Sequence, residues 1–177
     1  MRILTRIIGW ICLLAAATNR TQDHRELPKF EDFAVTEEWT GPSAAVKLVS
    51  PEELLFRTSL REAAKQPPNF AGHFRFVSWG CGTNCLGGAV INLKTGEVAQ
   101  PPLARNVRGE EHWIFCASLF EKGGTEYRRE SSLFIVRCGW KQDRNGNNTP
   151  DTYYFNFVES EFRELVHIPE NEKPKSR

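Results

Sequence analysis

Two cysteines and one histidine are the residues of this chain best suited to covalent chemistry. Cys81 and Cys85 are separated by three residues in a glycine-rich stretch, and His73 lies shortly before them. A thiolate beside a histidine base would act as a nucleophile, and two neighbouring thiols could form a redox pair. Redox pairs are typically separated by two residues and lie in a helical context that lowers the thiol pKa. We therefore favour a structural disulfide, and the alternative is a thiol redox enzyme or a cysteine-dependent hydrolase that uses Cys81, Cys85 and His73.

The start of the chain has the pattern of a secretion signal. Arg2 and Arg6 precede an apolar run that ends in three alanines at position 17. This run is about 11 residues long, whereas a membrane-spanning helix needs about 20. We therefore expect a cleaved signal peptide over residues 1–17, a periplasmic or extracellular protein, and no stable membrane span after cleavage.

Cleavage at this point would leave four cysteines, and an even number in an exported chain is typical of a disulfide framework. Four cysteines allow three pairings. We expect Cys81 to pair with Cys85, because the glycines around them let the backbone bend sharply. Cys116 and Cys138 lie in two strand-like runs and would form the second disulfide. In the chain-entropy model this second bridge would stabilise the fold by about 3 kcal/mol.

A polar stretch later in the chain has the spacing of a calcium-binding loop. Oxygen-bearing side chains recur at relative positions 1, 3, 5 and 9, which are Asp143, Asn145, Asn147 and Asp151. Such spacing can wrap a hard cation, but the twelfth position is Tyr154 instead of a carboxylate. A polar hairpin loop is the alternative interpretation. Calcium is therefore the one cofactor that the sequence raises, for a calcium-stabilised structural protein, and otherwise none is expected.

The glycine-rich turn around the cysteines is also a candidate binding surface. If the turn is rigid and exposed, it presents Thr83 and Asn84, with Trp79 beside them, to a partner. The whole chain has a formal net charge of +1, which argues against nucleic acid as the main partner because such binding needs a basic face. The expected partner is an envelope protein or a glycan.

The elements that would position these residues are mostly strands. Ser50, Pro51 and Glu53 form a helix start, and they predict either one helix over 51–66 or a short turn followed by a helix over 59–66. An additional strand could include Phe30 and Val35. Alternating and apolar runs predict further strands over residues 74–79, 88–93, 112–117, 132–138, 152–158 and 162–166, with a hairpin turn at 94–96.

The predicted fold class is α+β, with a mainly antiparallel β-sheet or meander, one N-terminal helix and disulfide staples. The length suits one domain with a substantial core. We place this globular domain at residues 28–168, between a flexible lead at 18–27 and a disordered tail at 169–177.

The stretch FRTSLREAAKQPPNFAGHFRFVSWGCGTNCLGGAVINLKTGEV, residues 56–98, resembles a family of small exported bacterial proteins of unassigned function. The shared signature is RTxLREAA, then NFAGH, then WGCGTxC and a TG-containing hairpin. The resemblance covers about a quarter of the chain. It implies an exported β-rich domain and no particular activity.

No local set of paired carboxylates, no Ser-His-Asp set and no histidine-rich metal motif stands out in the sequence. We therefore expect a non-catalytic binding or interaction domain of the bacterial cell envelope. The thiol enzyme and the calcium-stabilised structural protein remain the two alternatives.

Overall fold

The computed structural model describes residues 26–37, 39–82, 85–102, 105–107, 110–112, 114–116, 124–142 and 148–169. Of residues 81, 82, 85, 105–107, 110–112, 114–116, 139–142 and 148–150 it describes the backbone only. The expected signal peptide at 1–17, most of the lead at 18–27 and the tail beyond residue 169 lie outside the described residues.

The first sheet is a long hairpin with two short additional strands. β1 (Phe74–Gly82) pairs with β2 (Cys85–Asn92), and β2 also pairs with β3 (Val98–Ala99) and β6 (Ile114–Cys116). Every pairing is antiparallel. A separate two-stranded sheet joins β4 (Arg105–Val107) to β5 (Glu110–His112).

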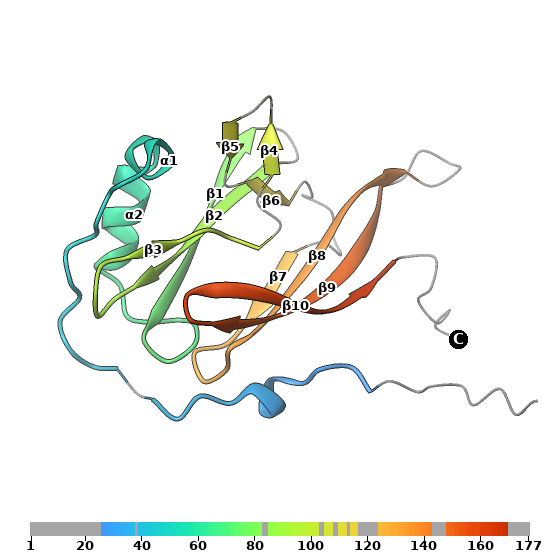
Figure 1. The fold of residues 1–177 in the computed structure, drawn as a ribbon, viewed down its shortest axis with the longest axis horizontal. Coiled ribbons are helices and arrows are strands. Elements are labelled where there is room, and N and C mark those ends of the chain that lie inside the picture. The colour runs from blue at the N-terminus through green and yellow to red at the C-terminus, as the bar shows by residue number, and fades with distance from the viewer. Residues whose placement is uncertain are drawn as a thin grey trace, which may run out of the picture.

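The second sheet is an antiparallel meander with the strand order β10-β9-β8-β7. Its strands are β7 (Gly124–Tyr127), β8 (Leu133–Gln142), β9 (Asn148–Val158) and β10 (Glu161–Ile168). Figure 1 shows the first sheet beside the helices, the second sheet on its other side, and the N-terminal segment in blue passing along the second sheet.

Three short helices precede the sheets. A 3-10 helix, η1 (Phe30–Phe33), is followed by α1 (Pro51–Leu55) and α2 (Arg57–Ala64). Ser50 caps α1 as the sequence indicates, because its side chain accepts a hydrogen bond from the Glu53 amide and the Glu53 carboxylate accepts one from the Ser50 amide. Within the described residues no helix is long and apolar enough to cross a bilayer.

The apolar core has three parts, one between each pair of adjacent layers. The largest lies between the two sheets and contains Phe70, Phe76 and Phe134. A second lies between α2 and the first sheet, around Leu60 and Ile91. The third lies between the second sheet and the N-terminal segment and contains the following side chains: Phe30, Phe33, Leu133, Ile135, Tyr154, Val166 and Ile168. Strands β2 and β8 are therefore buried on both faces, which explains why their sequences are almost continuously apolar.

The α+β class with mainly antiparallel sheets is confirmed, and the differences are local. Neither the single helix over 51–66 nor the short turn followed by a helix over 59–66 is found as predicted, because the segment forms two helices, α1 and α2. They are separated at Phe56, which has φ −98° and ψ 18° and whose ring stacks on Trp79 at 4.3 Å. The strand expected near Phe30 is instead the helix η1. The run at 112–117 contributes to two strands, β5 and β6, that belong to different sheets.

Candidate functional site

The predicted cysteine turn lies at the end of the β1–β2 hairpin. Gly82 is the register partner of Cys85, and the register shifts between Gly80 and Gly82, which leaves Cys81 as the extra residue of a β-bulge. Thr83 and Asn84 lie outside the described residues, so their predicted role in binding stays a prediction. Among the residues with described side chains there is no disulfide, and that set excludes three of the four cysteines, Cys81, Cys85 and Cys116.

Trp79, the other residue predicted to bind a partner, is half-buried and packs against the helices. Its ring stacks on Phe56 with a centroid distance of 4.3 Å, and a Cβ atom at Gly87 would lie 2.4 Å from the indole Nε1. Trp79 is one of the half-buried residues that pack α2 against the first sheet. It therefore helps to hold the helices in place, and only part of its side chain is open to a ligand.

The histidine and the cysteines of the thiol hypothesis lie far apart. His73 directly precedes β1, and Cys81 lies near the other end of this extended strand. At about 3.3 Å per residue, the two backbones are separated by roughly 25 Å. Cys85 lies opposite Gly82 at the same distant end. His73 is therefore not placed to act as a general base for either thiol.

His73 belongs to a polar cluster with Glu37 and Lys94. Its Nδ1 lies 2.9 Å from a Glu37 carboxylate oxygen, and the other oxygen of that carboxylate contacts the Lys94 ammonium group. The Lys94 nitrogen also lies 5.4 Å from the centroid of the Trp39 ring. This cluster ties the chain at Glu37, which follows η1, to the start of β1 and to the β2–β3 turn.

Burial lowers the pKa of His73 below its ordinary value of 6.5. The neutral ring donates Nδ1–H to Glu37. The unfolded chain therefore binds a proton more readily than the folded chain. As a result, the free energy of unfolding rises with pH between the folded-state pKa of His73 and about pH 6.5. The contribution of His73 is fully present above about pH 6.5 and is lost as pH falls toward the lower folded-state pKa.

We expect the melting temperature of the wild type to fall more steeply from about pH 7 to about pH 5 than that of His73→Gln. Glutamine can still donate a hydrogen bond to Glu37 but does not titrate. Glu37 and Lys94, the charged groups that face the ring, are present in both proteins. Parallel melting curves across this pH range would contradict a lowered His73 pKa.

Asp151, predicted as the last calcium ligand, contacts a histidine within the second sheet. It lies in β9 with only 7% of its surface exposed, and its carboxylate is 3.1 Å from His167 Nε2 on β10. Asp143, Asn145 and Asn147, the other predicted ligands, lie outside the described residues. Among the residues that are described, no group of three or more His, Cys, Asp or Glu side chains could hold a metal ion. Calcium binding therefore stays a prediction.

A groove, which the sequence analysis did not predict, lies between residues 39–46 and the end of α2. It consists of two adjoining hollows that share Ser43 and Lys65, with volumes of about 530 and 360 Å³. Segment 39–46 lines one side, and residues 61–68 line the other, with Arg129 at the far end. Figure 1 shows this segment running alongside α2 before it reaches α1.

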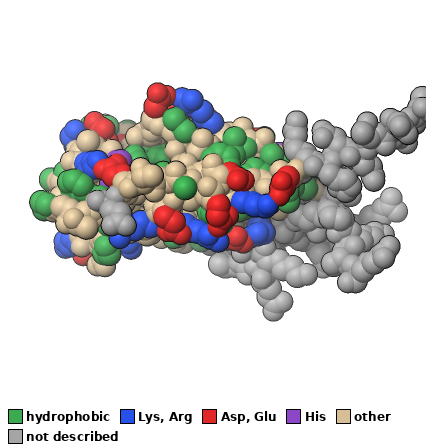
Figure 2. Space-filling view, turned by 90° about the horizontal axis from the view of Figure 1, so that it is seen from below, with side chains coloured by type: hydrophobic (Ala, Val, Ile, Leu, Met, Phe, Trp, Pro, Cys, Tyr) green, Lys and Arg blue, Asp and Glu red, His purple; other side chains and the backbone are tan. Residues whose placement is uncertain are grey.

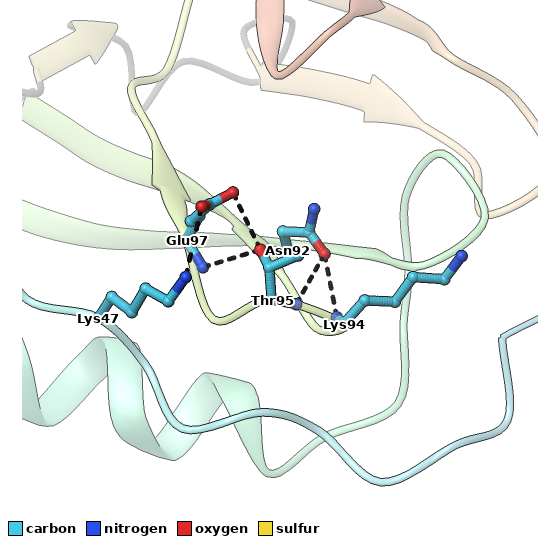
Figure 3. A network of polar contacts seen from close by, with 5 residues as sticks. All are labelled: Lys47, Asn92, Lys94, Thr95 and Glu97. Atoms are coloured by element: carbon cyan, nitrogen blue, oxygen red, sulfur yellow. Dashed lines mark hydrogen bonds and ion pairs between the residues drawn. The ribbon is translucent and has the colours of Figure 1, made fainter.

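Segment 39–46, which lines one side of the groove, is attached to the turn between β2 and β3 (Figure 3). The Asn92 side-chain oxygen accepts hydrogen bonds from the amides of Lys94 and Thr95, and Thr95 contacts Glu97. The groove segment is tied to this turn because the Ala44 amide donates to the carbonyl of the residue before Lys94, at 2.8 Å. The turn thus fixes the position of the groove segment.

The groove differs in charge from the rest of the described surface. Its lining includes three cationic side chains, Arg61, Lys65 and Arg129, and no carboxylate. On the face shown in Figure 2, acidic and basic side chains are interspersed. Several cations outside the groove are ion-paired, as in Arg128 with Glu31 at 3.0 Å, and in the groove Lys65 pairs with Glu62 at 2.6 Å, although Glu62 is not among the lining residues. The groove is therefore the candidate site for a ligand that carries negative charge.

Comparison with known protein families, with curated proteins and with solved structures gives no match to this chain. The described fold and groove define the class of protein: a domain with two four-stranded antiparallel sheets, the first covered by two short helices, and a cationic groove beside them.

Proposed function

We propose that this protein is a non-catalytic binding domain of the bacterial cell envelope and that the groove beside α2 is its binding site. The observation that supports this proposal is the composition of the groove, in which Arg61, Lys65 and Arg129 line two connected hollows without a carboxylate among the lining residues. Binding sites are typically concave surfaces with a few convergent polar groups. The secretion-signal pattern and the family resemblance support the location in the envelope.

A binding role also fits the chemistry of the candidate catalytic residues better than an enzymatic role does. His73 is engaged by Glu37 and lies at the opposite end of β1 from the cysteines. A nucleophile and its base must approach to about 3 Å. The separation along β1 is roughly 25 Å. The thiol enzyme that combines these residues is therefore not the function that we propose.

The groove proposal is tested by comparing what wild type and groove variants capture from envelope extract. We expect Arg61→Gln with Lys65→Gln to lose captured partners that the wild type retains, because two of the three groove cations are removed. The control is Lys29→Gln with Arg163→Gln, which removes the same charge from exposed residues outside the groove. Equal capture by both double variants would contradict the groove as the binding site.

We also propose the two disulfides Cys81–Cys85 and Cys116–Cys138, and the strand register supports this pairing. Cys81 and Cys85 are backbone neighbours at the β1 bulge. Cys116 is the register partner of Leu86, which packs against the core cluster that contains Cys138, and β6 contacts β8. Paired residues of antiparallel strands share a face of the sheet. The second disulfide would therefore join the two sheets.

Peptide mapping of the exported protein without reduction is expected to give these two linkages and no free thiol. The reason is that an oxidising compartment favours disulfides between cysteines whose backbones are close. Rapid alkylation of Cys81 at neutral pH, or a linkage between Cys81 and Cys138, would contradict this pairing.

A further inference from the structure

We infer that the groove binds an acidic peptide segment in an extended conformation. This inference rests on the proposed function, because it names the ligand class for the same groove. Three features of the described residues support it: the positions of the cations, the alternating exposure of the side chains along one wall, and the partial burial of Trp39.

The cations are spaced along the groove so that they could meet successive acidic side chains. Arg61 and Lys65 are four residues apart at the end of α2, which corresponds to about 6 Å along the helix axis. Lys65 forms an ion pair with Glu62 at 2.6 Å, but both side chains are almost two-thirds exposed. Such exposed pairs contribute little to stability, so a ligand carboxylate can replace Glu62. Arg129 lies at the other end of the groove and donates one hydrogen bond to the Trp39 carbonyl.

The wall opposite α2 is a segment that is tied to the β2–β3 turn by its backbone. Ala44 and Lys47 donate their amide hydrogens to the β2–β3 turn, each at 2.8 Å. Ala44 and Val46 are half-buried, whereas Ser43 and Ala45 are exposed, which is the alternation of a strand. A segment with this alternation that lines a groove is a surface along which an extended peptide can lie.

The groove tryptophan, Trp39, is half-buried, which favours a peptide over a glycan as the occupant. A Cβ atom at Gly41 would lie 2.6 Å from two Trp39 ring atoms, so the Gly41 backbone packs closely against this ring. The Lys94 ammonium group lies 5.4 Å from the centroid of the same ring. Sugars bind proteins largely by stacking on an open aromatic face, and these contacts take up part of the Trp39 ring. A peptide needs only the cations and the wall segment.

The test measures binding to fluorescein-labelled short poly-L-glutamate by fluorescence anisotropy at physiological ionic strength, about 0.15 M. Two probes of equal charge and similar length serve as comparisons, poly-D-glutamate and oligogalacturonate. The first has the same carboxylates on a chain of opposite handedness, and the second carries them on a glycan. We expect the wild type to bind the L-peptide at least about tenfold more tightly than either comparison probe.

Arg61→Gln with Lys65→Gln is expected to weaken binding of the L-peptide by about tenfold, whereas Lys29→Gln with Arg163→Gln changes it little. Melting temperatures of both double variants show whether each remains folded. Equal affinity for the L- and D-peptides, or tighter binding of oligogalacturonate, would overturn the peptide inference. Partner capture that still depends on Arg61 and Lys65 would then leave the proposed function standing, so that the two failures are distinguishable.

Discussion

Replacing Phe70 with alanine is expected to lower the free energy of unfolding by about 3–5 kcal/mol. Phe70 is fully buried, with 0% of its surface exposed, and it lies between the two sheets. Its ring contacts Phe134 at 5.4 Å and Phe157 at 5.2 Å, and it stacks parallel to Phe162 at 6.1 Å. Alanine would leave a cavity at a position where three strands of the second sheet supply the neighbours, and packed sheets collapse only partly around a cavity.

This effect is measured by urea denaturation at equilibrium, with Leu55→Ala as the matched control. Leu55 lies in α1 with 66% of its surface exposed, so its truncation should change stability by no more than about 0.5 kcal/mol. If Phe70→Ala cost no more than Leu55→Ala, the aromatic cluster would not be the main contact between the two sheets.

Much of the fold is local in sequence and was therefore predictable. The strands β1, β8 and β9 follow from runs of apolar and aromatic residues, and the start of α1 follows from the reciprocal contacts of Ser50 and Glu53. A break in this helical segment was one of the two predictions, but its position at Phe56 was not predictable, because the contact with Trp79 depends on how the helices pack against β1. Periodicity along the chain reports which residues are apolar, not which distant residue they meet.

The groove had no signal in the sequence because its parts come from distant segments. Arg61 and Arg129 are ordinary exposed or half-buried cations when each is considered alone, and residues 39–46 show no motif. The contact of His73 with Glu37 also had no signal in the sequence, because the two residues are 36 positions apart. The cysteine spacing, in contrast, drew attention to the end of β1 at Cys81. The two hollows of the groove lie elsewhere, beside α2.

The second large effect concerns Gly96 in the β2–β3 turn. Gly96 has φ +77°, a left-handed conformation that glycine adopts without strain. Its carbonyl accepts the hydrogen bond from Lys47, and a Cβ atom at this position would lie 2.0 Å from the Ala45 carbonyl oxygen. Because that obstacle is backbone, it cannot rotate away as a side chain would. The turn glycine thus allows residues 44–47 to approach the hairpin and form the groove wall.

We therefore expect backbone strain alone in Gly96→Ala to lower the free energy of unfolding by about 1–3 kcal/mol. Displacement of the Ala45 segment should add to this loss and should also weaken binding of poly-L-glutamate more than the change in stability explains. The control is Gly80→Ala, where a Cβ atom meets nothing within 4 Å. Urea denaturation and fluorescence anisotropy of both variants measure the two effects. A folded Gly96→Ala protein with unchanged binding would show that the groove wall does not depend on this turn, since the alanine can be accommodated only if residues 44–47 move away from it.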